Sequence, residues 1–214
     1  QDRRPLSTSF RLLDRLKGEG DMPGLTSFIL HLASSSMNKY DEMRSIMEGH
    51  NIDLRIANIK GEEIQTFSVL KVAERAAETV AQNFQSPLIV EDTGLYVHSL
   101  YGFPASYASF VYGTLGPGGI LKLLEGREDM TAEFHSAIVY AEGGKILKRF
   151  VGISEGKISK EIRGSQGFGF DPIFIPEGSE RTFAEMTRTE KNLISHRSKS
   201  SKILAEWISG RRAR

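Results

Sequence analysis

The segment that most constrains this chain is LIVEDTGL at residues 88–95. The apolar run 88–90 predicts a buried strand, which two carboxylates, Glu91 and Asp92, follow at once. In open α/β sheets ligands bind just beyond the carboxyl ends of strands, and acids there can hold a divalent cation through hard oxygen atoms. Such a cation can bridge the protein and the phosphates of a substrate. A plain polar turn after the strand fits the same pattern, so this segment alone leaves both interpretations open.

Length and composition narrow the class of protein. A chain of 214 residues with 39% hydrophobic and 26% charged residues suits one soluble domain or two small lobes. The net charge of +1 gives no electrostatic case for nucleic acid, and the longest apolar stretch, residues 28–33, is too short for a membrane span. The absence of cysteine excludes disulfides and thiolate sites, and it is compatible with a reducing cytoplasm, where we expect the protein.

The two ends of the chain differ in composition from its middle. Residues 1–22 are rich in Arg, Ser and Gly and are expected to form a loosely held extension. A start of this kind can mimic an organelle transit peptide, but Asp2 and Asp14 argue against one. We therefore expect one domain over residues 23–210, followed by a basic tail at 211–214.

Hydrophobic periodicity predicts a β-α-β-α-β start, with strands at 25–33, 52–59 and 88–90 and helices at 38–48 and 67–84. Two short helices at 105–112 and 119–124 are expected around a Gly-Pro loop. Three strands of a meander follow at 131–140, 146–154 and 157–162, with turns at 142–144 and 155–156. A short strand at 173–175 and a helix at 195–209 complete the chain. The pattern indicates an α/β fold with a mixed sheet, a second lobe built of strands and a groove between the lobes.

Three further stretches are candidate parts of a site, and each has a purely structural alternative. The first strand runs into Ser34-Ser35-Ser36-Met37-Asn38-Lys39. Backbone N–H groups at the start of a helix, together with the charge of Lys39, form a natural phosphate cradle. The alternative is an ordinary serine N-cap.

The second stretch, GSQGFGFDP at residues 164–172, combines glycines, two aromatic rings and an acid. Phe168 and Phe170 offer flat faces for a planar ring, Gly169 permits close backbone approach, and Asp171 can accept hydrogen bonds from a base or sugar. The alternative is a glycine-rich turn with both phenylalanines in the core.

The third stretch opens the last helix, where Ser195 is a plausible N-cap. His196 and Arg197 would then lie in the first turn, with Lys191 just before it. Positive side chains oppose the helix dipole there, which indicates a bound anion. The alternative is a basic, solvated start of the helix.

Taken together, these motifs resemble the inosine/xanthosine triphosphate pyrophosphatase family. The resemblance extends from about Phe28 to Trp207 and includes the segment GFPASY at 102–107. The segments that carry it, in chain order, are MNK at 37–39, EDTGL at 91–95, GFGFDPIF at 167–174, TFAEM at 182–186 and KNLISHR at 191–197.

The resemblance implies an elongated α/β protein of two lobes around a central groove, usually a homodimer. It implies Mg²⁺-dependent hydrolysis of non-canonical purine nucleoside triphosphates (ITP, dITP and XTP) to the monophosphate and pyrophosphate, which cleanses the nucleotide pool. By the same resemblance, Asp92 is the essential acid, and Glu63 and Asp92 hold the metal. The remaining matched positions contact the substrate. Residues 34–39 match the phosphate-binding segment, residues 168–171 match the base-binding loop, and Thr93 supplies a hydroxyl. Contacts to the phosphates and to the 6-oxo group of the base are implied for Lys191, His196 and Arg197.

The chain departs from that family at two places. First, Ser34-Ser35-Ser36 replaces the usual Thr-Gly-Asn. Second, the family has a lysine in the helix before the acidic strand, and by spacing that position is near Glu78 here. Lys71, two turns earlier, is a candidate substitute. Reduced activity or a shifted substrate is therefore an alternative. Two rival functions follow: a Maf-type pyrophosphatase of pyrimidine or modified nucleotides, and a nucleotide-binding homologue with weak or no turnover.

Overall fold

The computed structural model describes residues 27–213, so the extension expected at residues 1–22 lies outside the described residues. Within them, one mixed seven-stranded sheet has the order β2-β1-β3-β5-β6-β7, and β4 pairs with β3. The strands are β1 Phe28–Ala33, β2 Ile52–Ala57, β3 Leu88–Val97, β4 Pro104–Ala105, β5 Thr131–Glu142, β6 Lys145–Ile158 and β7 Phe174–Pro176. The helices are α1 Met37–Glu48, α2 Val69–Ala81, α3 Ala108–Thr114, α4 Gly116–Leu123, α5 Arg188–Ile194 and α6 His196–Arg212.

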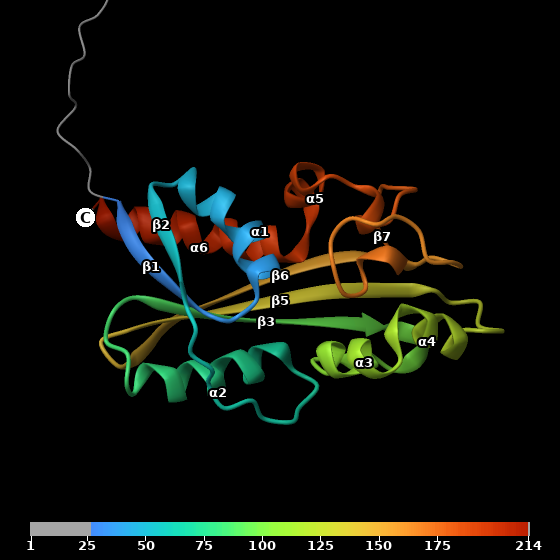
Figure 1. Cartoon of the computed structure of the whole chain (residues 1–214), viewed down its shortest axis with the longest axis horizontal. Helices are drawn as coiled ribbons and strands as arrows, with labels where there is room; N and C mark the ends of the chain where they lie inside the picture. The colour runs from blue at the N-terminus through green and yellow to red at the C-terminus, as the bar shows by residue number, and fades with distance from the viewer. Residues whose placement is uncertain (1–26, 214) are drawn as a thin grey trace, which may run out of the picture.

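Helices cover both faces of the sheet at the end where β1 and β2 lie (Figure 1). On one face, α1 and α6 bury Leu30, Ile89 and Leu204 in a common apolar cluster. On the other face, α2 packs with its alanine- and valine-rich side against Val90 and Val139. Since successive side chains of a strand point to opposite faces, Ile89 and Val90 fix the orientation of every residue that follows them on β3.

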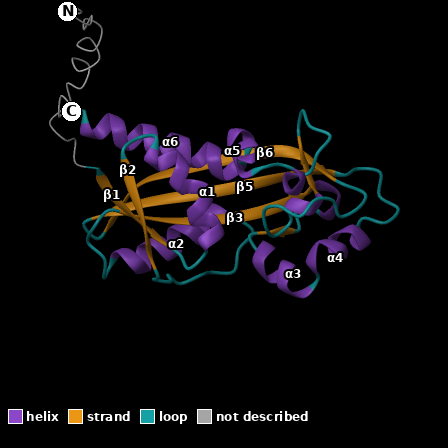
Figure 2. Cartoon of the chain, turned by 45° about the horizontal axis from the view of Figure 1, so that its top comes forward, coloured by secondary structure: helices purple, strands orange, loops and turns teal. Residues whose placement is uncertain are grey.

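A second lobe lies at the far end of the sheet, where α3 and α4 pack with residues 170–186 (Figure 2). Its core contains Phe134 from β5 and Phe174 and Phe183 from the later loop segment. The long strands β5 and β6 run through both lobes and join them (Figure 2). The expected class, an elongated two-lobed α/β fold with a mixed sheet, is confirmed.

The register of β3 leaves one stretch of its edge open. β1 runs parallel to β3 but pairs with it only at His31↔Leu88 and Leu32↔Ile89. β4 covers the same edge again only from Leu95. The other edge of β3 pairs with β5 along its whole length. Residues 91–94 therefore lie beyond the carboxyl end of β1 with an open edge on that side, and this opening positions the site.

Two sequence predictions about strand ends are wrong. β3 does not stop at Val90 but continues through Glu91 and Asp92 to Val97, because β5 pairs with it throughout. The acids are thus part of a strand, and neither lies in a turn. β6 likewise does not turn at residues 155–156. Gly156 instead allows β7 to approach, since a Cβ there would lie 2.2 Å from the carbonyl oxygen of Ile175.

The helices follow the sequence more closely. Ser36, Ser68 and Ser195 cap α1, α2 and α6, each by accepting a hydrogen bond from a backbone N–H three residues on. α4 begins at Gly116, inside the expected Gly-Pro loop, and α5 was not expected. α6 runs to Arg212 into the expected tail, where Arg211 forms an ion pair with Glu142 at 3.0 Å. Across residues 27–213, we find no helix whose length and apolar character would let it cross a bilayer.

Candidate active site

The start of α1 is where the first predicted site segment lies. β1 ends at Ala33, and the hydroxyl of Ser34 accepts a hydrogen bond from the Ser36 N–H at 3.0 Å. Ser36 Oγ in turn accepts from the Lys39 N–H at 3.3 Å. Serine N-capping is thus present at the start of α1, a 12-residue helix whose dipole favours an anion at this end. Ser35, Met37 and Asn38 are exposed beside it.

Lys39 connects α1 to the open edge of β3. Its Nζ donates to the backbone carbonyl of Glu91 at 2.9 Å and lies 2.9 Å from Oε2 of the same residue. The Lys39 side chain is still 21% exposed, whereas that of Glu91 is fully buried. An amine held in this way remains within reach of an anionic ligand at the opening.

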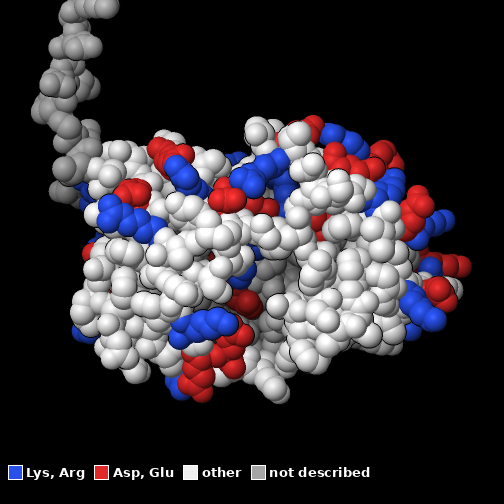
Figure 3. Space-filling model, in the orientation of Figure 1, with Lys and Arg blue, Asp and Glu red and all other residues white. Residues whose placement is uncertain are grey.

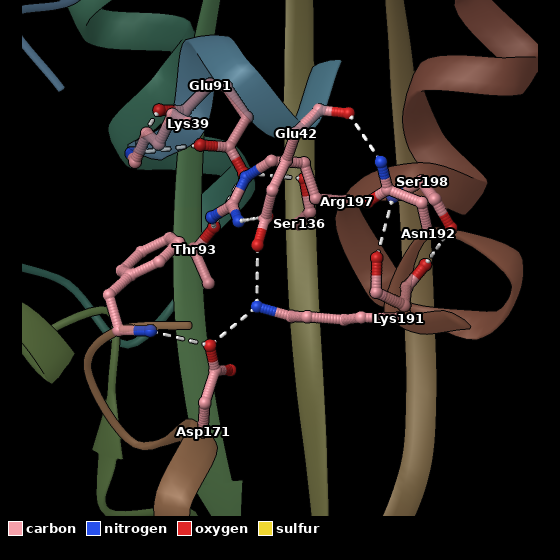
Figure 4. Close-up of polar contacts among 12 residues, drawn as sticks. Lys39, Glu42, Glu91, Thr93, Ser136, Asp171, Lys191, Asn192, Arg197 and Ser198 are labelled. Carbon is pink, nitrogen blue, oxygen red and sulfur yellow. Dashed lines mark hydrogen bonds and ion pairs between the residues drawn. The ribbon is translucent and has the colours of Figure 1, made fainter. Parts of the chain in front are cut away.

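Glu91 faces α6 and is surrounded by donors (Figure 4). Its Oε1 accepts from Thr93 Oγ1 at 2.6 Å, from Ser136 Oγ at 2.7 Å and from Arg197 Nε at 3.1 Å. Burial would raise the pKa of Glu91, but the charges of Arg197 and Lys39 outweigh it and hold that pKa well below its usual range. This carboxylate is therefore ionised and fully engaged with the protein.

Asp92 follows Glu91 on β3, so its side chain points to the opposite face of the sheet, the one that α2 covers. Burial raises its pKa to about 7; Lys39 opposes the shift, whereas Glu91 and Glu63 add to it. Its Oδ2 is buried and has no hydrogen-bond partner among the described residues. A carboxyl that titrates near neutral pH and keeps a free oxygen is a candidate general base or cation ligand.

Glu63 lies exposed in the loop between β2 and α2, close enough to Asp92 to raise its pKa. The described residues contain no group of three or more His, Cys, Asp or Glu side chains that could hold a metal. Mg²⁺ commonly takes only one or two carboxylates and completes its shell with water and substrate phosphates. The unpartnered Asp92 oxygen and the nearby Glu63 fit an ion bound in that manner.

A buried ion-paired network extends from Glu91 toward the second lobe (Figure 4). Lys191 Nζ lies 2.6 Å from both Glu42 Oε1 and Asp171 Oδ2, and its side chain is 3% exposed. Arg197 pairs with Glu42 and donates to Thr93 Oγ1 at 2.8 Å. The network brings together α1, β3, the 164–172 loop and the start of α6, which are far apart in the chain.

The 164–172 loop divides its two aromatic residues between the site and the core. The Phe168 ring lies 4.9 Å from Lys191 Nζ and 5.3 Å from Arg197 Cζ, measured to the ring centroid. Its backbone N–H donates to Asp171 Oδ2 at 2.8 Å. Gly167 permits this, since a Cβ there would lie 2.1 Å from that oxygen. Phe170 is buried in the core of the second lobe and so matches the structural alternative.

His196 is buried at the start of α6, with its ring stacked on Phe134 at a centroid distance of 4.6 Å. Neither ring nitrogen has a hydrogen-bond partner among the described residues. Burial, reinforced by the charges of Arg197 and Lys191, holds the pKa of His196 well below its usual value. The ring is therefore neutral, and one nitrogen can donate while the other accepts.

Most of the predicted residues therefore meet around one opening. Figure 3 shows a hollow between the two lobes, with basic and acidic side chains on its floor. A separate cavity of about 490 Å³ lies elsewhere and contains none of the site residues. It is lined by His98, Thr131, Ala132, Glu133, Glu155, Gly156, Lys157, Ile175, Pro176, Glu177, Gly178, Ser179 and Glu180.

Sequence reasoning missed Glu42, the acid that bridges Lys191 and Arg197. It lies three residues after Lys39 and next to Met43 on the buried side of α1, and a charge at a buried helix position was the available signal. The expected substitute lysine, Lys71, is exposed in the first turn of α2, and Glu78 pairs with Arg75 at 3.6 Å.

Comparisons with known proteins identify the family of this chain. A model of the Ham1 family matches residues 30–207. The dITP/XTP pyrophosphatase of Saccharolobus solfataricus is 47% identical over 177 residues, which cover 82% of this chain and 91% of that protein. The enzyme of the same name from Thermococcus kodakarensis is 45% identical over 179 residues, 84% of this chain and 96% of that protein.

Solved structures give the same answer for the fold. A HAM1 protein from Coxiella burnetii superposes with a TM-score of 0.76 at 28% identity, and the match covers 86% of this chain and 99% of that one. The relatives carry the name of the activity that the motifs pointed to, so the resemblance is confirmed. The chain belongs to the Ham1 family.

Proposed function

We propose that this chain hydrolyses the triphosphates of deaminated purines, ITP, dITP and XTP, to the nucleoside monophosphate and pyrophosphate. The observation that carries the proposal is Asp92, with its free buried oxygen and a pKa raised to about 7, beside Lys39 at the open edge of β3. The names of the relatives, dITP/XTP pyrophosphatases, support the same substrate class. They do not favour the Maf-type alternative.

In the proposed reaction, water attacks the α-phosphorus, the bond to the bridging oxygen of the β-phosphate breaks, and pyrophosphate leaves. Asp92 takes the proton of the attacking water on Oδ2, its buried oxygen that has no partner among the described residues. Lys39 offers positive charge to the phosphates. The Thr93 hydroxyl, which donates to Glu91 in this structure, would turn from Glu91 to the substrate. Preorganised charge of this kind is the main contribution a protein makes to phosphoryl transfer.

Mg²⁺ is part of the proposal, with Asp92 and Glu63 as the residues that would hold it. The ion would neutralise phosphate charge and polarise the reacting phosphoryl group. Since Oδ2 of Asp92 serves the attacking water, Asp92 would hold the ion through its other carboxylate oxygen, and Glu63 is exposed to solvent and can turn toward a bound ion.

Selection for deaminated bases would come from the side of the opening formed by Phe168, Arg197 and His196. Hypoxanthine and xanthine have an acceptor oxygen at position 6, where adenine has a donor amino group. Arg197 supplies N–H donors close to the Phe168 ring, on which a base could stack. Donors left unpaired beside an amino group would reject adenine, and such mismatches cost large factors in specificity. Lys191 and Asp171 would support the same end of the substrate.

A substrate panel tests the proposal directly. Pyrophosphate release should be strong from ITP and XTP with Mg²⁺ and weak from dGTP and UTP. Release from UTP but not from ITP would point to the Maf-type alternative. Binding of ITP without release would point to a homologue that has lost turnover through its serine segment at 34–36.

We also propose that the protein acts as a homodimer in the cytoplasm, where the nucleotide pool lies. Large apolar side chains are exposed on α3 and in the turn that follows it, among them Phe110 and Leu115 at 70% and 52%. A second copy would remove such surface from water. Sedimentation at micromolar concentration should give twice the mass of the chain, and a monomer would contradict this.

A further inference from the structure

The contacts of Glu91 join the two ends of the site. Oε2 lies 2.9 Å from the Nζ of Lys39, which belongs to residues 34–39, the segment proposed to contact the phosphates. Oε1 accepts from the Nε of Arg197, which comes from the opposite side, at 3.1 Å. Among the described residues, these two cations meet on this one carboxylate (Figure 4).

The Glu91 carboxylate has little freedom to adjust. Its side chain is fully buried, and the hydroxyls of Thr93 and Ser136 both donate to Oε1. Ser136 is itself fixed by Ser200 Oγ on α6, 2.9 Å away. Since a carboxylate is planar and rigid, a shift that improves its contact with one cation changes its contact with the other.

Glu42 provides the natural comparison within the same network. It is also buried, and it also pairs with Arg197, but its second cation is Lys191 rather than Lys39. Glu42 therefore holds two groups at the base end, whereas Glu91 holds one group from each end.

We propose that Glu91 is a positioning residue that couples the two halves of the substrate, so that occupation of the base end strengthens binding at the phosphate end. This rests on the proposed function, since it takes Lys39 as a phosphate contact and Arg197 as a base contact. When a base engages Arg197, the Glu91 carboxylate stays in its fixed arrangement, and the partly exposed Lys39 amine on its Oε2 becomes ordered with it. Pyrophosphate then binds to a site already ordered, which is positive coupling between two ligands.

The two products of the proposed reaction, IMP and pyrophosphate, test this by calorimetry on the full chain with Mg²⁺. In the parent protein, saturating IMP should lower the dissociation constant of pyrophosphate by about fivefold or more, within the range usual for coupled sites. Glu91→Gln keeps an acceptor for Arg197 but faces Lys39 with an amide. In this variant the ratio of the two dissociation constants should fall to about one.

Glu42→Gln is the matched control. It should weaken the binding of IMP. The ratio of the pyrophosphate dissociation constants without and with IMP should stay as in the parent, since Glu42 does not contact Lys39. If Glu91→Gln does not fold, Glu91→Asp replaces it, because the shorter side chain keeps the charge but cannot reach both cations. A ratio that survives either Glu91 variant, or is lost equally in Glu42→Gln, would overturn the coupling role.

The outcome in the parent protein separates this inference from the proposed function. Failure to bind either IMP or pyrophosphate would contradict the proposed function. Binding of both ligands with a ratio of one would leave that function standing and refute the coupling alone.

Discussion

Glu91 and Asp92 are adjacent acids on one strand, yet the protein treats them in opposite ways. Glu91 faces α6, where burial would raise its pKa but Arg197, Lys39 and the Thr93 hydroxyl hold it well below the usual range. Asp92 lies on the face that α2 covers, where burial raises its pKa to about 7 and one oxygen has no partner among the described residues. Two successive residues of one strand thus provide a carboxylate that is bound within the protein and a carboxylate that is available for chemistry.

The difference teaches that residue type alone does not assign a role in such a pair. Burial is common to both acids, so the neighbours decide the sign of the pKa shift. Asp92 feels Lys39 at longer range than Glu91 does, and it also feels the negative charges of Glu91 and Glu63. Glu91, through its ion pair, lowers the free-energy cost of burying Arg197. Its negative charge also makes the Asp92 carboxylate easier to protonate.

The largest expected effect is on turnover in Asp92→Asn. The amide cannot take a proton from water, so pyrophosphate release from ITP should fall by about 10²- to 10⁴-fold, the usual share of a general base. Far-UV circular dichroism and IMP binding should remain near the parent values. Glu78→Gln, an exposed acid on α2, is the control and should retain full activity. Substantial turnover in Asp92→Asn would remove Asp92 from its catalytic role.

The second effect is on the free energy of unfolding. Here loss of Glu91 should cost more than loss of Asp92, the reverse of their importance for turnover. Glu91→Ala leaves Arg197 buried beside a lost partner, and breaking such a pair costs about 3–5 kcal/mol of unfolding free energy. Asp92→Ala removes an unfavourable buried charge and should cost far less. Urea denaturation at pH 7.5 compares them. Equal losses in the two variants would show that the acids do not differ as their contacts indicate.

The sequence could predict much of this arrangement, for identifiable reasons. Serine caps and apolar stripes are local signals, so α1, α2 and α6 were found close to their observed ends. Short motifs such as EDTGL and KNLISHR carried the family resemblance and, with it, the segments that meet at the opening.

What the sequence could not give depends on pairing between distant segments. Residues 91–94 read as a strand end because their polarity interrupts an apolar run, but the partner strand β5 keeps them extended. The orientation of Glu91 and Asp92 to opposite faces follows only once that extension is known. The bridging role of Glu42 likewise requires Lys191, 149 residues away in the chain.

The pH dependence of stability sharpens the comparison further. The raised pKa of Asp92 means that the folded state holds its proton up to about pH 7, whereas the unfolded chain releases it near 3.8. Between these values the folded state binds more protons, so this acid makes stability fall as pH rises. Compared with Asp92→Asn, the parent should therefore lose about 1–2 kcal/mol between pH 4 and 7, allowing for the partial exposure of Asp92.

Glu91 should act in the opposite sense and in another window. Its pKa is lowered from 4.5, so its contribution is complete above that pH and is lost as the pH falls below it. The difference in stability between the parent and Glu91→Gln should thus shrink on acidification below about pH 4.5. Thermal unfolding across pH 3–8 measures both variants. If the stability difference between the parent and each variant changed with pH in the same direction, the opposite pKa shifts of Glu91 and Asp92 would be contradicted.

The smallest expected effect concerns one hydroxyl that supports the paired acid. Ser136 is fully buried, donates to Glu91 at 2.7 Å and contacts Ser200, so Ser136→Ala should cost about 1 kcal/mol. Ser201 is the matched control: it is equally buried, but its hydroxyl has no partner among the described residues. Ser201→Ala should therefore be neutral or slightly stabilising, because it removes an unsatisfied group. Identical losses from both serines in urea denaturation would mean that the hydroxyl on Glu91 adds nothing to the stability of the pair.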